Sequence, residues 1–323
     1  MSQALAELTT IHVGGVPKRI HVANTRDELV FIAKEVWART ENWLVLGGGS
    51  NLVAADDISD LEVIQVRNLG LEYKGQGRLR VQAGENWNDF VNHAAKEGLA
   101  GVESLAGIPG TVGAAPIQNI GAYGQELSLT FHSLEFLDYE TNELQIMTKA
   151  DCQFGYRDSI FKRGKRGIVT WVEFQFFTDL PAAHSELLGA RVEEVIGQRA
   201  SKGMVLDDKD HDTWSCGSFF TNPIVSERFA KTLPLDSPQW PTEADDGLTV
   251  KLSAAWLIEQ SGIHKGFSLP GSKAAISSKH ALAITNRGDA TAEEVVQLAR
   301  YIQTQVSNKF GINLEPEPNL IGF

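Results

Sequence analysis

The sequence is poor in cysteine and has no long apolar run, and both absences narrow the class of protein. Its 323 residues include only two cysteines, Cys152 and Cys216, which cannot build a disulfide framework and lack the spacing of a zinc site. No stretch approaches the roughly 18 consecutive apolar residues that a membrane helix requires. The first ten residues show no basic region leading into an apolar one. We therefore expect a soluble, cytoplasmic protein without a metal site.

Positive charge is also scarce. The formal net charge is −12, which disfavours nucleic acid and anionic membranes as partners because both bind to basic surfaces. A small anionic substrate is still compatible with this balance, but only if cations gather locally.

The composition is otherwise that of a folded protein. Apolar residues make up 42% and charged residues 22%, which excludes extensive disorder, and the 30 glycines follow no collagen-like period. At about 150 residues per domain, the length predicts two or three compact units.

Helical and extended signals alternate irregularly along the chain. A capping-box pattern at 25–28 precedes apolar residues at helical spacing, and further helices are predicted at 86–97, 253–260 and 293–310, the last ended by Gly311. Apolar or β-branched runs predict strands at 43–46, 63–66, 79–83, 134–139, 168–177 and 281–284. Residues 191–200 are expected to begin the connection to the last part of the chain.

No βαβ rhythm repeats, so the pattern favours an α+β fold over a doubly wound sheet. We predict three parts at about 1–67, 68–203 and 204–323, with the last few residues packing back on the first part.

A glycine run follows the first predicted strand. Gly47-Gly48-Gly49-Ser50-Asn51 would let successive backbone N–H groups form an anion nest with no side chain in the way. The run matches neither the dinucleotide-binding fingerprint nor the P-loop. A flexible turn is the alternative.

An uncharged stretch stands out in the middle of the chain. Residues 104–125 carry no charge, and 107–124 contain five glycines and two prolines, which rules out an ordinary helix or central strand. Exposed loops usually carry charge, so this one is expected to be buried. A large flat cofactor fits such a wall, and a loop packed between domains is the alternative.

Three further segments contain candidate chemical groups. Arg157 lies among Phe154, Tyr156, Ile160 and Phe161, where a fixed guanidinium could offer a fork of donors to a carboxylate. An Arg-Asp neighbour pair is, however, most often a solvated surface pair.

The segment 215–223 offers Cys216 and Ser218 as nucleophiles, but neither sits in a nucleophile elbow, and a turn entering an aromatic strand is the simpler interpretation. Glu315 and Glu317 would face the same side of an extended segment, and spacing does not tell which one matters.

In this order and at these intervals, the segments 47–51, 107–124, 155–162, 217–223 and 314–317 resemble the UDP-N-acetylenolpyruvoylglucosamine reductase family, flavoenzymes of peptidoglycan precursor synthesis. The resemblance spans nearly the whole chain. It implies two α+β subdomains of the vanillyl-alcohol-oxidase (PCMH) type that hold FAD, followed by a C-terminal α+β substrate domain. It also implies that NADPH reduces FAD, that hydride then passes to the β-carbon of an enolpyruvyl ether, and that a proton reaches the α-carbon.

The resemblance assigns roles residue by residue. Arg157 and Glu317 match the residues that stabilise the enolate, and Ser218 matches the proton donor. Lys202, Asn222 and Tyr156 are the substrate-binding candidates. The cofactor-binding candidates are Gly47, Gly48, Gly49, Ser50, Asn51, Gly107, Gly110, Thr111, Gly113, Ala114, Gly121 and Tyr123.

Some features depart from the family. Residues 178–190 contain no tyrosine to match the lid tyrosine of one subgroup, and His184 is the nearest polar ring. Cys216 takes a position where small residues are usual, so we interpret it as a small filler. Small-molecule substrates and a monomer are expected. A flavin oxidase on the same fold and a non-catalytic nucleotide-binding module are the alternative functions; the lack of histidine and cysteine in the glycine-rich stretches disfavours a covalently anchored flavin.

Overall fold

The computed structural model describes residues 3–178, 184–244 and 247–323. The chain forms two compact units. Unit 1 contains Val16–Ser50 and Asp57–Val205, and unit 2 contains Leu5–Gly15, Asn51–Asp56 and Leu206–Phe323. The chain thus contributes two short segments to unit 2 before its C-terminal part completes that unit. The division into three parts stays a prediction.

Unit 1 begins with a small parallel sheet, in the order β1-β4-β2, and one helix. Strands β1 (Arg19–Ala23), β2 (Trp43–Leu46) and β4 (Glu62–Val66) form it, and helix α1 (Arg26–Trp37) buries Leu29, Ala33 and Val36. The predicted cap is half confirmed. Thr25 Oγ1 accepts from the Glu28 amide at 3.1 Å, but the Glu28 carboxylate accepts from the Asn24 amide, one residue before the cap.

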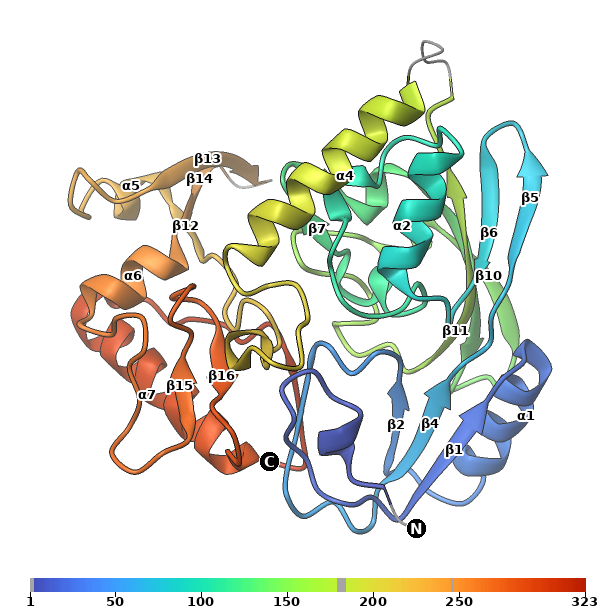
Figure 1. Cartoon of the computed structure of the whole chain (residues 1–323), viewed down its shortest axis with the longest axis horizontal. Helices are drawn as coiled ribbons and strands as arrows, with labels where there is room; N and C mark the ends of the chain where they lie inside the picture. The colour runs from blue at the N-terminus through green and yellow to red at the C-terminus, as the bar shows by residue number, and fades with distance from the viewer. Residues whose placement is uncertain (1–2, 179–183, 245–246) are drawn as a thin grey trace. The chain divides into compact units, whose positions relative to one another are not determined.

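The larger part of unit 1 is an antiparallel sheet in the order β10-β9-β11-β6-β5, with helices α2 and α4 on one face (Figure 1). Apolar side chains of β6, β9 and β11 form one buried cluster there with side chains of both helices. The strands are β5 (Leu71–Gly75), β6 (Arg78–Gln82), β9 (Phe131–Asp138), β10 (Leu144–Thr148) and β11 (Gly167–Gln175), and the helices are α2 (Trp87–Lys96), α3 (Lys149–Cys152) and α4 (His184–Ala200). The short elements are η2 (Glu103–Leu105), η3 (Ala115–Gln118), η4 (Leu127–Leu129), β7 (Gly121–Ala122) and β8 (Gln125–Glu126).

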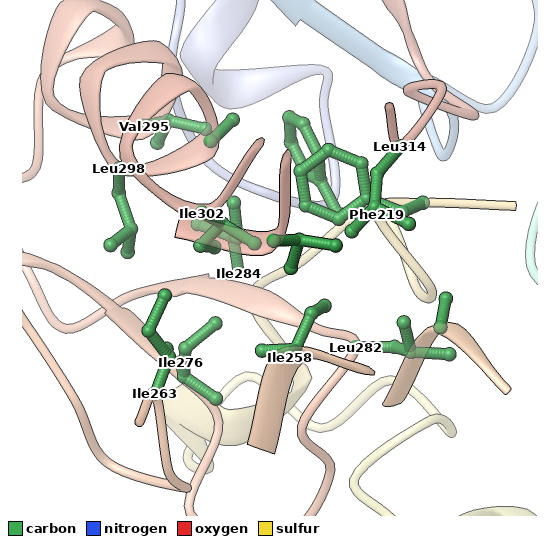
Figure 2. Packing of buried hydrophobic residues seen from close by; sticks show 14 of the residues in the cluster. Phe219, Ile258, Ile263, Ile276, Leu282, Ile284, Val295, Leu298, Ile302 and Leu314 are labelled. Carbon is green, nitrogen blue, oxygen red and sulfur yellow. The ribbon is translucent and has the colours of Figure 1, made fainter. Parts of the chain in front are cut away.

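Unit 2 is built around one long helix, α7 (Ala292–Phe310). Thr291 and Glu294 form a complete capping box at its start, and Gly311 ends it in the left-handed region at φ +67°. Figure 2 shows Val295, Leu298 and Ile302 of this helix packed with Phe219 and Leu314. The other elements are η1 (Leu5–Glu7), β3 (Leu52–Ala54), η5 (His211–Thr213), β12 (Ile224–Ser226), α5 (Glu227–Ala230), β13 (Gln239–Ala244), β14 (Gly247–Leu252), α6 (Ala254–Gln260), β15 (Ala274–Ile276), β16 (Ile284–Asn286) and β17 (Asn319–Ile321).

Two predictions about secondary structure were wrong. Residues 191–200 do not begin a connection but form the second half of α4, because Leu188, Val192 and Val195 bury one face of a longer helix. The buried run 281–284 is mostly a turn, and β16 continues instead through the buried polar Thr285 and Asn286. Of the helices in the described part of the chain, none is long and apolar enough to cross a membrane.

Candidate active site

The glycine run after β2 lies against the middle of the uncharged stretch. A Cβ at Gly47 would lie 2.5 Å from Thr111 Oγ1, and one at Gly48 would lie 2.7 Å from Gly110 Cα. Ser50 Oγ donates to the Pro109 carbonyl at 2.9 Å. Two loops that are distant in sequence thus pack at distances that only glycine allows at positions 47 and 48.

The uncharged stretch is itself tied to the end of β6. The Val112 amide donates to the Glu85 carbonyl and the Gly113 amide to the Ala83 carbonyl, both at 2.9 Å. Val112 is buried, whereas the backbone on either side, at Gly107–Thr111 and at Gly113 and Ala114, stays half-buried or exposed. This loop is therefore anchored by a few apolar side chains and presents an uncharged rim; that a flat cofactor buries this rim stays a prediction.

Arg157 lies in a tight turn in the same unit. Gly155 and Asp158 close the turn with hydrogen bonds between their backbones, at 3.0 and 3.3 Å. Arg157 has φ +51°, in the left-handed region, where a residue other than glycine costs roughly 1–3 kcal/mol. Its Nη2 donates to the Gly121 carbonyl, and its Cζ lies 5.3 Å from the centre of the Tyr156 ring.

Cations surround Tyr123, which also has a left-handed backbone at φ +48°. The Lys202 ammonium lies 5.8 Å and the Arg191 guanidinium 6.0 Å from the centre of its ring. Burial lowers the pKa of Arg199, and Tyr123 partly offsets this effect. The structure thus gathers three cations near Tyr123. An acidic chain needs such a local group of cations if it is to bind an anionic ligand.

Arg199 is a residue that the sequence analysis missed. Its Nη2 donates to the Met204 carbonyl at 3.2 Å, but its buried Nε has no hydrogen-bond partner among the described residues. A Cβ at Gly107 would lie 3.4 Å from this Nε. The sequence indicated Arg199 only by its proximity to a predicted site residue, since it stands three residues before Lys202.

These observations test whether the residues of unit 1 fit FAD. The packing of glycines 47 and 48 places the two loops side by side, and the half-buried or exposed residues of the uncharged rim leave a surface that a large ligand could cover. The buried, unpartnered nitrogen of Arg199 is a donor that an anionic group could satisfy. The residues present therefore fit the cofactor.

In unit 2, the backbone brings the Ser218 and Glu317 segments together. The Glu317 amide donates to the Phe219 carbonyl at 2.9 Å, and the Thr221 amide donates to the Glu315 carbonyl at 3.0 Å. Asn51 is part of this arrangement, because its Nδ2 donates to the Glu317 carbonyl at 3.2 Å. The two predicted catalytic residues of this unit thus lie on paired segments.

The two glutamates of the terminal segment differ in environment. Glu315 is exposed, whereas Glu317 is half-buried. Glu317 also influences Cys216: burial raises the pKa of that thiol to about 12, and the Glu317 carboxylate adds to the rise. A buried thiol with this pKa is not a nucleophile near neutral pH, which agrees with its interpretation as a filler.

The ligand-binding roles of all the predicted site residues stay predictions, including those of Asn222 and of the lid region. Asn222 Oδ1 accepts from the Ala254 amide at 2.9 Å and so caps α6 together with Ser253. The lid comparison falls largely on residues 179–183, which lie outside the described part of the chain.

Comparison with known proteins gives the class first. Residues 17–146 match an FAD-binding domain, and residues 208–321 match the C-terminal domain of UDP-N-acetylenolpyruvoylglucosamine reductase. The chain is an FAD-dependent oxidoreductase, and the α+β fold predicted from the sequence is confirmed.

Whole-chain relatives give the family. The chain is 46% identical to the UDP-N-acetylenolpyruvoylglucosamine reductase of Leifsonia xyli subsp. xyli, over 99% of this chain and 98% of that protein. It is 43% identical to the enzyme of the same name from a Mycobacterium species, over 99% and 95%. A crystal structure of the Thermus caldophilus reductase superposes with a TM-score of 0.72 at 28% identity, covering 99% and 98%. The chain belongs to the UDP-N-acetylenolpyruvoylglucosamine reductase family, whose reaction serves peptidoglycan precursor synthesis.

Proposed function

We propose that this chain reduces the enolpyruvyl ether of UDP-N-acetylglucosamine to UDP-N-acetylmuramate, with NADPH as the electron donor. The observation that carries the proposal is the 46% identity over nearly the full length of both chains. The net change is the addition of one hydride to the β-carbon and one proton to the α-carbon, while NADPH becomes NADP⁺. FAD, when bound, supplies the hydride. We further propose that the enzyme acts as a cytoplasmic monomer.

FAD would be held by the glycine run and the uncharged rim. The donors at hand are the backbone N–H groups of 47–51 together with those of Gly110 and Thr111, which suit a diphosphate. Tyr123 and the Gly121 backbone would face the ring system. This assignment is supported by the close packing of glycines 47 and 48 on residues 110 and 111.

Arg157 and Glu317 are proposed to stabilise the charge that develops on the substrate carboxylate. Addition of hydride to the β-carbon leaves a carbanion at the α-carbon, which delocalises into the neighbouring carboxylate. Groups fixed in advance stabilise such charge better than groups that must reorganise, and a planar guanidinium matches a carboxylate. The hydrogen bond from Arg157 to Gly121 supports a fixed side chain.

Ser218 is proposed to deliver the proton to the α-carbon. A hydroxyl is a weak acid, so this step requires a strongly basic carbanion and a fixed donor. Support for a fixed position comes from Phe219, which is fully buried and whose amide donates to the Leu282 carbonyl at 2.8 Å. Lys202, Tyr156 and Asn222 are proposed to bind the nucleotide part of the substrate, with Lys202 supplying charge for its diphosphate.

The test separates the two half-reactions under anaerobic conditions. NADPH should bleach the flavin of the Ser218→Ala variant at nearly the wild-type rate. Reoxidation by the enolpyruvyl substrate should then fall at least a hundredfold, the order expected for loss of a general acid. Ser261→Ala is the matched control, since that hydroxyl donates to the Leu257 carbonyl within α6.

Three results would contradict the proposal. If the wild-type flavin is reoxidised by oxygen but not by the enolpyruvyl substrate, a flavin oxidase is favoured. If Ser218→Ala abolishes bleaching by NADPH, Ser218 is not the proton donor. A protein that neither is yellow nor takes up FAD would favour the non-catalytic module.

A further inference from the structure

We propose that Asn119 and Ser159 are positioning residues for Arg157, and that they clamp its turn to the uncharged segment assigned to FAD. The inference rests on the proposed role of Arg157 in the second half-reaction. Neither residue was selected from the sequence.

The clamp consists of three hydrogen bonds between two short segments of unit 1. The turn 155–159 and the segment 117–121 are joined at alternate residues. The bonds run from Asn119 Nδ2 to the Gly155 carbonyl (3.0 Å), from Arg157 Nη2 to the Gly121 carbonyl, and from Ser159 Oγ to the Ile117 carbonyl (2.5 Å). Along the turn, Arg157 thus lies between the two residues that the other bonds hold, while its own acceptor, Gly121, lies at the end of the facing segment.

The donor residues of these two bonds are buried, and their acceptors are half-buried. Asn119 is 1% exposed and Ser159 is fully buried. Asn119 is fixed further, because its Oδ1 accepts from the Ser128 amide and its Nδ2 also donates to Glu126. A buried amide with these partners has no competing water and a single orientation, so it can transmit position.

Backbone conformation gives an independent reason for a clamp. Arg157 has a φ of +51°, which an arginine keeps only where its surroundings impose it, whereas Asn119, at +48°, ends η3 in the left-handed region that asparagine tolerates. The turn around Arg157 is short, and its two closing backbone bonds leave the side chain direction open. The bonds from Asn119 and Ser159 hold the turn against the segment 117–121. This segment carries the Gly121 carbonyl, which accepts from the guanidinium.

Gly121 completes the arrangement. A Cβ there would lie 2.7 Å from Arg157 Nη1 and 3.0 Å from the Gln125 carbonyl. Only glycine lets the guanidinium rest on the backbone at this point. The glycine, predicted as a cofactor contact, therefore also determines where Arg157 lies.

The experiment uses the FAD-loaded full-length protein and measures both half-reactions. Asn119→Gly removes the amide but tolerates the left-handed backbone, and Ser159→Ala removes the hydroxyl. Each variant should keep FAD and be bleached by NADPH within about twofold of wild type. Reoxidation by the enolpyruvyl substrate should slow roughly ten- to a hundredfold, because a shift of about 1 Å in a positioning group has this effect.

A double-mutant cycle distinguishes positioning from general loss of structure. In an Arg157→Met background, Asn119→Gly and Ser159→Ala should have no further effect on reoxidation, since the group that they position is gone. Thr170→Val is the matched control. It removes a similarly buried hydroxyl, which donates to Glu135 at 2.6 Å, and should leave both half-reactions unchanged.

Three results would overturn the inference: reoxidation at the wild-type rate in both variants, equal slowing of bleaching and reoxidation, or additive effects in the Arg157→Met background. Failure of the proposed function gives a different result from failure of this inference. It would appear as wild-type protein whose reduced flavin the enolpyruvyl substrate does not reoxidise.

Discussion

The two units hold their proposed catalytic residues in different ways. In unit 1, Arg157 sits on a turn with a left-handed backbone, and polar side chains fix it. In unit 2, Ser218 and Glu317 lie on extended segments that pair through their backbones above buried Phe219 and Leu314. The position of Arg157 thus depends on a few hydrogen bonds, whereas that of Ser218 and Glu317 depends on an apolar core.

The two units also differ in how many charged side chains they bury. Unit 1 buries four carboxylates that pair with cations, at Glu62, Glu135, Asp138 and Glu173. Among the described residues of unit 2, only Asp212 is comparable, paired with Arg287 at 3.0 Å. Unit 1 should therefore be the more sensitive to acid, and unit 2 the more sensitive to loss of apolar volume.

The largest effect is expected for Phe219→Ala in unit 2. Removing a fully buried aromatic ring from the core should lower the free energy of unfolding by roughly 3–5 kcal/mol. The neighbouring Ser218 and Glu317 should also lose their fixed positions, so reoxidation of the flavin should slow while bleaching by NADPH does not. Urea unfolding and the two half-reactions measure these effects.

Phe174→Ala is the matched change in unit 1, since Phe174 is equally buried and packs on Phe90 at a ring distance of 4.8 Å. It should cost similar stability without a selective effect on reoxidation. A selective loss in this variant too would show that the contrast between the two units is wrong.

Several helices were predicted correctly from the sequence, because capping residues and apolar periodicity are local features. The predicted helices at 253–260 and 293–310 appear as α6 and α7 with capping side chains at Ser253 and Thr291. The start of α4 was missed, and so was the polar end of β16. Asn286 is buried there because its side chain donates to the Ile11 and His12 carbonyls, partners that are remote in sequence.

The sequence predicted which residues are candidates for the site, but it could not predict how they are arranged in space. Glycine content and the lack of charge indicated the stretch that we assign to the ligand, and family motifs named Arg157, Ser218 and Glu317 as candidates. The left-handed backbone at Arg157 and the bonds from Asn119 and Ser159 could not be predicted, because they arise where two segments about 40 residues apart in the sequence meet.

An intermediate effect is expected for Gly48→Ala in unit 1. The added methyl would meet Gly110 Cα at 2.7 Å, so one of the two loops must move. Overpacking of this kind costs roughly 1–3 kcal/mol. FAD should dissociate more readily, and the thermal shift caused by added FAD should shrink.

Gly197→Ala is the control in the same unit. Apart from the helix's own backbone, no atom of the described residues lies within 4 Å of a Cβ at this exposed position of α4. Alanine should therefore stabilise the helix by up to about 1 kcal/mol and leave FAD binding unchanged. Normal FAD binding by Gly48→Ala would contradict the assignment of this loop.

The smallest effect is expected for Glu62→Gln, which tests the acid sensitivity of unit 1. Burial alone would raise the pKa of Glu62, but hydrogen bonds from His21, Lys18 and Arg39 outweigh it and lower the pKa from 4.5 to about 2. Because the pKa is lower in the folded state, Glu62 stabilises the fold above pH 4.5, and this contribution disappears as the pH falls toward 2.

Since Lys18 and Arg39 are partly exposed and screened by solvent, Glu62→Gln should cost roughly 1–2 kcal/mol at pH 7. The difference from wild type in urea unfolding should narrow as the pH is lowered from 5 to 3. Glu35→Gln is the control, because Glu35 pairs with the same Arg39 at 3.9 Å but is 57% exposed, and its loss should change stability by less than about 0.5 kcal/mol. A difference between wild type and Glu62→Gln that stays constant from pH 7 to pH 3 would mean that the buried carboxylate is not the source of acid sensitivity, and the contrast in buried charge between the two units would then have no consequence for stability.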